Sequence, residues 1–192
     1  MAEHNEIGGP AASLLQAAQA HAGSNEGKRG TPPVHLWNPD YCGEIDILIR
    51  RDGTWIHEGT PIGRPGLVRL FASILKREDD RHYLVTPVEK LGIRVEDAPF
   101  VAVDFETGDG AITFTTNVGD TVTAGPDHPI RVEMAADGEP SPYVEVRRGL
   151  EALIDRKSFY RLVELGEERD GQFGVASDGA FFPIIDAAAL PD

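Results

Sequence analysis

The stretch of this 192-residue sequence that is richest in chemically useful side chains runs from Asp52 to Arg64. It supplies five candidate ligand-binding residues, namely Trp55, His57, Glu58, Thr60 and Arg64. Histidine and glutamate are common general acids and bases, and arginine is suited to clamping an anion. His57 and Glu58 are adjacent, so on a strand they point to opposite faces and cannot act directly together. The alternative interpretation makes Trp55 a core residue and His57 its partly exposed neighbour.

A second candidate stretch is Thr86-Pro87-Val88-Glu89-Lys90, from which we take Thr86, Glu89 and Lys90 as candidate ligand-binding residues. Thr60-Pro61 and Thr86-Pro87 are extended X-Pro elements on either side of an expected helix. We therefore expect their loops to meet at one end of that helix, where Glu89 pairs with Arg64 or receives a ligand amine. Ordinary turn chemistry is the alternative.

Signatures of known catalytic sites are missing from the sequence. It has no G-x-S-x-G elbow, phosphate-binding loop or dinucleotide fingerprint, and Gly108-x-Gly110 precedes an expected strand rather than a helix. His35, His82 and His128 lack metal-ligand spacing, and Cys42 has no adjacent base. We predict no catalytic residue, no metal site and no cofactor.

The elements that must position these residues alternate between strands and a few helices. An amphipathic helix is expected over Ser13–Ala22, and a linker over Gly23–Pro33. Alternating isoleucines predict a strand from Glu44, and Asp52-Gly53 predicts a hairpin turn into a return strand at 55–58. The clearest helix begins at Pro65, with apolar residues at helical spacing, namely Leu67, Leu70, Phe71, Ile74 and Leu75. We expect the polar run 76–81 to end it.

The second half of the chain is expected to be almost entirely β-structure. One short helix is predicted with Ser158 as its N-cap and Gly166 as its end. A hairpin formed by 173–175 and 181–185 is expected to close the fold.

Two segments repeat the pattern Ile-x-Arg-x-x-Φ-Φ-Arg-Leu-Φ (Φ, apolar or aromatic) at a constant offset, since 154 − 62 = 92 and 161 − 69 = 92. The repeated positions are Ile62, Arg64, Arg69 and Leu70, and then Ile154, Arg156, Arg161 and Leu162. Duplication explains the match better than coincidence. Because active sites are seldom built twice, recurrence favours a structural role for these arginines over an anion clamp.

Charge is distributed unevenly along the chain. Residues 1–96 hold 13 acidic and 11 basic side chains, a net of −2, whereas residues 97–192 hold 19 and 7, a net of −12. The total of −14 argues against nucleic-acid or anionic-membrane binding. One cysteine cannot make an internal disulfide, and no apolar stretch is long enough to span a bilayer, so we expect a soluble cytoplasmic protein.

Four motifs carry a resemblance to a known family. They are Trp37-Asn-Pro-x-x-Cys42-Gly-x-Ile-Asp46, Asp52-Gly-Thr-Trp55-x-x-Glu58-Gly-Thr60-Pro-Ile, Arg64-x-x-Leu67-Val-x-Leu70-Phe71 and Thr86-Pro-Val-Glu89-Lys90. Over about residues 13–186 the chain resembles the Domain of Unknown Function 1285 family of bacterial proteins. The resemblance implies two related α/β-roll units and an involvement in signal transduction. It implies no established activity, catalytic residue or cofactor.

We therefore predict an α+β fold of two similar α/β-roll units, each with mostly antiparallel strands around one helix, plus an N-terminal helix. The expected boundaries are 1–33 for the N-terminal helix and linker, 34–98 for the first unit, and 99–192 for a β-rich second unit with one short helix.

The leading functional hypothesis is a non-catalytic binding or regulatory module that recognises an unknown protein or small-molecule ligand near the first unit's helix. An enzyme using His57, Glu58 or Glu89 for acid–base chemistry is one alternative. A structural or oligomerisation subunit is another. The sequence leaves the oligomeric state open.

Overall fold

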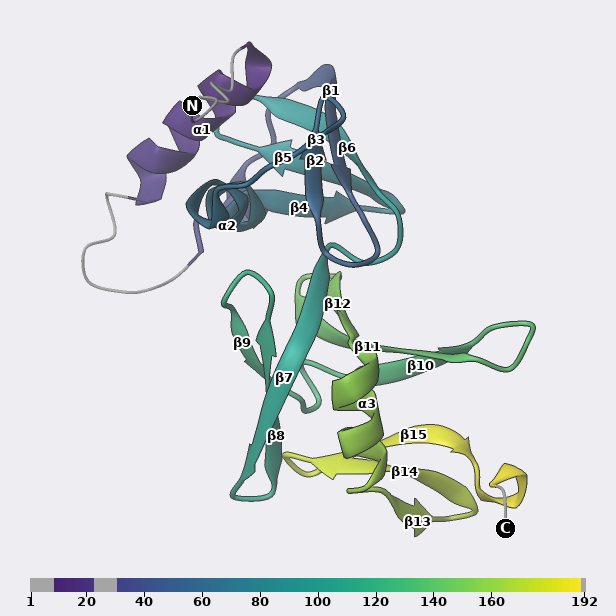
Figure 1. Ribbon diagram of the computed structural model, residues 1–192. Coiled ribbons are helices and arrows are strands. Elements are labelled where there is room, and N and C mark those ends of the chain that lie inside the picture. Colours follow the sequence, from purple (N-terminus) through teal and green to yellow (C-terminus); the bar gives the residue numbers. More distant parts are fainter. Residues whose placement is uncertain (1–8, 23–30, 191–192) are drawn as a thin grey trace. The chain divides into compact units, whose positions relative to one another are not determined.

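The computed structural model describes residues 9–22 and 31–190, and the chain divides into two compact units, Met1–Glu96 and Asp97–Asp192. Each unit is β-rich, with few helices and one six-stranded sheet (Figure 1). The predicted linker at 23–33 falls largely outside the described residues. Within the described ranges, no helix is long and apolar enough to cross a membrane.

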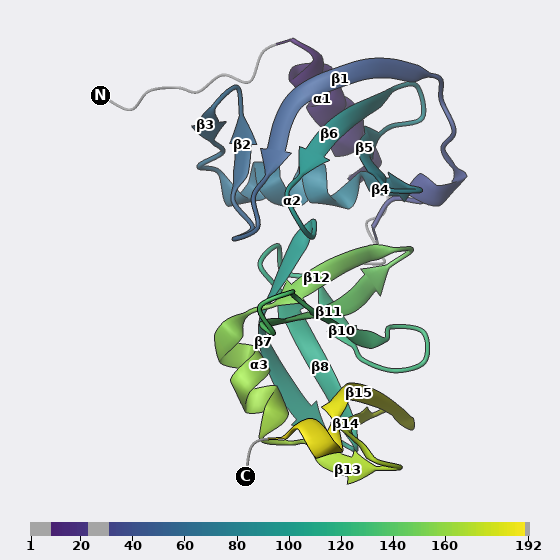
Figure 2. The same ribbon diagram turned by 90° about the vertical axis from the view of Figure 1, so that its right-hand side faces the viewer.

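The first unit joins two three-stranded meanders into one sheet. Its elements are α1 (Pro10–Ala22), η2 (Val34–Leu36), β1 (Tyr41–Ile49), β2 (Trp55–His57), β3 (Thr60–Pro61), α2 (Pro65–Ser73), β4 (Leu75–Glu78), β5 (Arg81–Val85) and β6 (Lys90–Val95). The strand order is β3-β2-β1-β6-β5-β4, and only the central pair β1–β6 is parallel. Figure 2 shows α1 and α2 on the same face of this sheet.

Alternation along β1 decides which face of the sheet is buried. Ile45, Ile47 and Ile49 are buried, whereas the residues between them are exposed or half-buried. This period of two is the one expected for a strand with one face in the core. We call the face covered by α2 the inner face, and the opposite one the outer face.

The second unit carries a sheet of the same design and a smaller third sheet. Its elements are β7 (Phe100–Gly108), β8 (Ala111–Thr116), β9 (Thr121–Thr123), β10 (Ile130–Met134), β11 (Pro140–Arg147), β12 (Leu150–Ile154), α3 (Arg156–Val163), β13 (Glu167–Arg169), β14 (Gln172–Ser177), β15 (Ala180–Asp186) and η3 (Ala187–Ala189). The six-stranded order is β10-β11-β12-β7-β8-β9, with β12 and β7 parallel, and β13-β14-β15 form the third sheet.

The two large sheets share one topology. In each, the first strand of the first meander pairs in parallel with the last strand of the second, β1 with β6 and β7 with β12. The helices occupy different places, because α2 joins the two meanders of its unit whereas α3 follows the second meander. The repeat at offset 92 therefore aligns α2 with α3. Each of these helices is followed by a meander, but the two helices do not occupy equivalent places relative to the two large sheets.

Two expected helix boundaries are wrong. α2 ends at Ser73, and the polar run 76–81 lies in strand β4 and its turn into β5, with which β4 pairs. The predicted N-cap Ser158 lies inside α3, whose N-cap is Asp155, and the Ser158 N–H donates to the Asp155 carboxylate at 2.7 Å. In both cases long-range pairing or capping by a better acceptor overrides the local pattern.

Candidate functional site

Trp55 lies in the core of the first unit. Its side chain is 2% exposed and stacks on Phe71 of α2, with ring centroids 6.2 Å apart and an interplanar angle of 11°. The buried indole N–H has no hydrogen-bond partner among the described residues. Trp55 therefore fixes α2 to β2, and this burial keeps its ring away from an external ligand.

His57, Glu58 and Thr60 belong to a tight hairpin between β2 and β3. His57 pairs with Thr60, and both Glu58 (φ 48°) and Gly59 (φ 77°) have positive φ, as a two-residue turn between antiparallel strands requires. The Glu58 N–H donates to the Asp46 carbonyl oxygen at 3.1 Å. The hairpin therefore gives each residue a structural place: His57 ends β2, Glu58 lies in the turn, and Thr60 begins the edge strand β3.

Thr86 and Glu89 lie in the turn between β5 and β6, and Lys90 is the first residue of β6. The buried Thr86 hydroxyl oxygen accepts the Glu89 N–H at 3.1 Å, and the Thr86 N–H donates to the Glu89 carbonyl oxygen at 2.9 Å. The Glu89 carboxylate accepts a hydrogen bond from the Ser13 hydroxyl of α1 at 3.2 Å. Glu89 thus holds the N-terminal helix rather than Arg64.

The expectation that the two X-Pro loops meet is wrong. The sheet register places Thr60 opposite His57, which in turn lies opposite Ile47, whereas Lys90 lies opposite Tyr41 at the start of β1. Ile47 is six steps from Tyr41 along β1 (47 − 41 = 6), which is about 20 Å at about 3.3 Å per residue. The acid–base enzyme hypothesis therefore loses Glu89 as a partner of the β2–β3 hairpin.

The arginines of the repeated pattern differ between the two copies. Arg156 is ion-paired with Glu139. Arg161 is ion-paired with Asp104 on β7, lowers the pKa of that carboxyl, and donates to the Phe105 carbonyl oxygen at 3.1 Å. The Arg161 contacts link α3 to β7, whereas the exposed Arg156–Glu139 pair links α3 to the residue before β11.

Arg64 and Arg69 have no such role. Both side chains are exposed, and within residues 9–22 and 31–190 neither guanidinium has a hydrogen-bond or ion-pair partner. Arg64 is the N-cap of α2 but contributes no side-chain cap, and the first turn of α2 contains no acidic residue. Two guanidinium groups thus face solvent on α2, one at its N-cap (Arg64) and one in the middle of the helix (Arg69).

A β-bulge in β1 creates an aromatic and charged cluster that sequence reasoning missed. Three steps along β1, from Tyr41 to Glu44, match two steps along β6, so both side chains lie on the outer face. Gly43, with φ 109°, is the sequence signal that could have located the bulge. The Tyr41 hydroxyl donates to the Glu44 carboxylate, which raises the pKa of Tyr41. Arg81 is ion-paired with the same carboxylate.

A second charge cluster lies beside it on the outer face. Glu78 accepts a hydrogen bond from Lys90 at 2.9 Å and lies 3.0 Å from the Lys76 ammonium, and these contacts lower the pKa of Glu78. The Lys90 ammonium is 5.1 Å from the Tyr83 ring centroid, and Lys76 also donates to the Trp37 carbonyl oxygen at 3.0 Å. Lys90 therefore takes part in a structural network.

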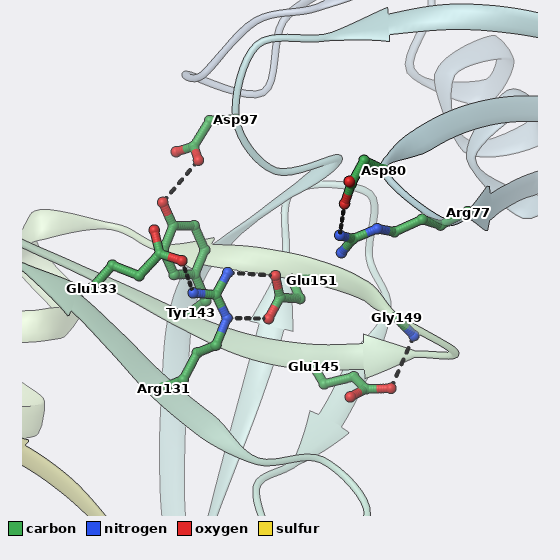
Figure 3. Close-up of polar contacts among 9 residues, drawn as sticks. All are labelled: Arg77, Asp80, Asp97, Arg131, Glu133, Tyr143, Glu145, Gly149 and Glu151. Atoms are coloured by element: carbon green, nitrogen blue, oxygen red, sulfur yellow. Dashed lines mark hydrogen bonds and ion pairs between the residues drawn. The ribbon is translucent and has the colours of Figure 1, made fainter.

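The second unit has a cluster at the equivalent place of its own sheet, shown in Figure 3. Arg131 of β10 makes a bidentate ion pair with Glu151, at 2.6 and 2.7 Å, and a further pair with Glu133. Its guanidinium lies 4.3 Å from the Tyr143 ring centroid, and the Tyr143 hydroxyl donates to Asp97 at 2.8 Å. These charges pair with one another, so the cluster links the three strands β10, β11 and β12.

Among residues 9–22 and 31–190, no group of three histidine, cysteine, aspartate or glutamate side chains is arranged to hold a metal ion.

His82 of β5 is predicted to make the first unit sensitive to mild acid. Burial lowers the pKa of His82 to about 4, with Arg77 adding to the effect, and the buried Nε2 atom lacks a partner in the described part of the chain. The unfolded chain takes up a proton near pH 6.5 and the folded chain does not, so stability falls as the pH drops from about 6.5 towards 4. We expect the free energy of unfolding to fall by about 1–2 kcal/mol, less than for a fully buried histidine because part of the ring reaches solvent.

Urea unfolding of the intact protein at pH 7 and pH 5 measures this loss. In His82→Leu, the free energy of unfolding should differ less between the two pH values. His35→Gln, at an exposed position, is the matched control and should keep the full difference. If His82→Leu lost as much stability between pH 7 and pH 5 as the intact protein, the acid sensitivity would belong to other groups.

Comparisons with known proteins agree with the resemblance carried by the four motifs. Residues 32–98 match the model described as "Domain of unknown function (DUF1285), N-terminal domain", and residues 99–184 match "Protein of unknown function (DUF1285), C-terminal domain". A search of curated proteins gave no match.

Two solved structures are similar to this chain. A DUF1285 family protein from Silicibacter pomeroyi DSS-3 is 60% identical, with 91% of this chain and 96% of that chain covered and a TM-score of 0.82. A DUF1285 family protein from Shewanella baltica OS155 is 32% identical, with 62% of this chain and 90% of that chain covered and a TM-score of 0.51. Neither description states an activity, a ligand or a partner.

Proposed function

The chain belongs to the DUF1285 family, and from that premise we propose that it is a non-catalytic binding or regulatory module whose first unit receives an acidic partner. The proposed contact surface is the exposed part of α2 from its N-cap Arg64 to Arg69 in the middle of the helix. The observation that carries the proposal is the contrast within the repeat. The Arg156 and Arg161 side chains are ion-paired with Glu139 and Asp104 of their own unit, whereas the Arg64 and Arg69 side chains face solvent without hydrogen-bond or ion-pair partners among the described residues.

The charge around α2 supports an acidic partner. The sequence has no acidic residue between Glu58 and Glu78, although the whole chain has a net charge of −14. Guanidinium groups bind carboxylates and phosphates bidentately, and the N-terminal end of a helix adds a partial positive charge. An acidic segment of a partner protein would therefore be held on the exposed part of α2 from Arg64 to Arg69.

The finer parts of this proposal concern fold and setting. We describe the units as α/β rolls with one helix each, plus an N-terminal helix, and attribute their likeness to duplication. The shared strand order of the two large sheets supports this description. The single cysteine is compatible with a cytoplasmic setting. A role in bacterial signal transduction would follow if the acidic partner is a signalling protein.

Binding of a fluorescein-labelled hexaglutamate peptide, followed by fluorescence anisotropy at low salt, tests the surface. Because each exposed charge pair is worth about 0.2–1 kcal/mol, we expect Arg64→Ala and Arg69→Ala each to weaken binding about threefold, and the double variant about tenfold.

Arg94→Ala is the matched control, because it removes the same charge from the same unit but its guanidinium is already ion-paired with Asp46 at 2.7 Å. Equal losses in Arg94→Ala and in the α2 variants would reject α2 as the contact surface. Light scattering separates this result from self-association through the acidic second unit.

A further inference from the structure

The outer face of the first unit contains two tyrosine rings set almost at right angles. The Tyr41 and Tyr83 ring centroids are 6.2 Å apart with an interplanar angle of 83°. The Glu44 carboxylate, which accepts a hydrogen bond from the Tyr41 hydroxyl, adds a negative charge beside them. Two aromatic rings and a carboxylate are the groups that recognise an organic cation.

The backbone is shaped to bring these groups together. The bulge at Gly43 turns Tyr41 to the face that carries Glu44. Opposite Glu44, Gly92 leaves the room that the carboxylate occupies, because a Cβ atom at residue 92 would lie 2.4 Å from the Glu44 Oε1 atom. The bulge in β1 and the glycine in β6 therefore both help to place the Glu44 carboxylate beside Tyr41.

A cation already occupies this arrangement. The guanidinium carbon of Arg81 lies 5.7 Å from the Tyr41 centroid and 5.4 Å from the Tyr83 centroid, and Arg81 is ion-paired with Glu44. The Arg81 side chain is 58% exposed, and Tyr41 is 49% exposed. Tyr83 is 8% exposed and packs with Val34 and Val85, so Tyr41 supplies the open side of the site. Exposed ion pairs are weak, so a competing cation can displace Arg81 and take its place beside the two rings.

We propose that Tyr41, Tyr83 and Glu44 form a binding site for a guanidinium or alkylammonium cation, which Arg81 fills in the free protein. The cation is supplied either as a small molecule or as an arginine or methylated lysine side chain of a partner. This site lies on the face of the sheet opposite α2 and takes cations, so it is independent of Arg64 and Arg69.

The experiment titrates the full-length protein with arginine amide, tetramethylammonium and the peptide acetyl-Gly-Arg-Gly-amide at constant ionic strength. Ring-proton resonances of Tyr41 and Tyr83 report binding. Arg81→Ala removes the guanidinium from both rings and leaves the Glu44 carboxylate without its ion-pair partner, while Lys90 stays paired with Glu78 beside Tyr83. We expect this variant to bind all three probes about tenfold more tightly than the intact protein, the gain from removing one exposed ion pair and its cation–π contacts.

Two further variants decide the outcome. Arg94→Ala removes an ion-paired arginine from the same face and should bind like the intact protein. Tyr41→Ala in the Arg81→Ala background should lose the tenfold gain. The proposal fails if Arg81→Ala binds no more tightly than Arg94→Ala, or if the gain survives without Tyr41. Tighter binding of the peptide than of arginine amide identifies a partner's side chain as the source, and equal binding identifies a free cation.

Discussion

Replacing Trp55 with alanine is expected to destabilise the first unit by about 3–5 kcal/mol, the usual cost of removing a buried tryptophan. The substitution removes the stacking on Phe71 and leaves a cavity between β2 and α2. Chemical unfolding followed by circular dichroism measures the change. Loss of partner binding in this variant would report unfolding rather than a contact surface.

Thr60→Ala is the matched control for Trp55→Ala. Thr60 is exposed on the neighbouring strand β3, and substitutions at such positions usually change stability by less than about 0.5 kcal/mol. If Trp55→Ala proved as mild as Thr60→Ala, the indole would have to be a surface group, and the assignment of Trp55 to the core would be wrong.

Replacing Gly174 with alanine is expected to destabilise the second unit by about 2–3 kcal/mol. An added Cβ atom would lie 2.2 Å from the Phe182 carbonyl oxygen and 2.8 Å from the Pro183 Cα atom. Both are backbone atoms of the paired strand β15, so relief requires the strands β14 and β15 to move apart. Thermal unfolding and amide exchange along β14 would measure the effect.

Gly108→Ala is the control for the Gly174 substitution. Gly108 ends β7, and a Cβ atom added there meets nothing within 4 Å. We expect a change of less than about 0.5 kcal/mol. A loss in Gly174→Ala no greater than that in Gly108→Ala would mean that the two strands accommodate the methyl group.

Local patterns located the first meander well. The alternating isoleucines of β1 are buried as predicted, and Asp52-Gly53 turns the chain into β2. Apolar period and turn residues express forces that act over a few residues, so one sequence suffices to read them. The family resemblance rests on similarly local motifs and is confirmed.

The candidate site could be read only in part. The candidate residues share useful chemical types and lie close in the sequence, but Trp55 lies inside the core while Lys90 of β6 lies opposite Tyr41, at the other end of β1. The parallel pairing of β1 with β6 sets that separation. Long-range strand pairing depends on which sheet edge is available and on burial, neither of which appears in the local pattern.

By itself, the sequence determined the family, the β-rich character of both halves, and the uneven charge of −2 and −12. Composition and short-range periodicity carry this information because each is a property of neighbouring residues. Only the tertiary structure decided which charged groups are already paired. It joins Arg161 to Asp104 across 57 residues and leaves Arg64 exposed, and it brings Arg81 between two tyrosines from different strands. An ion pair depends on the distance between two atoms in the folded chain, and that distance is fixed only when the strands have found their register.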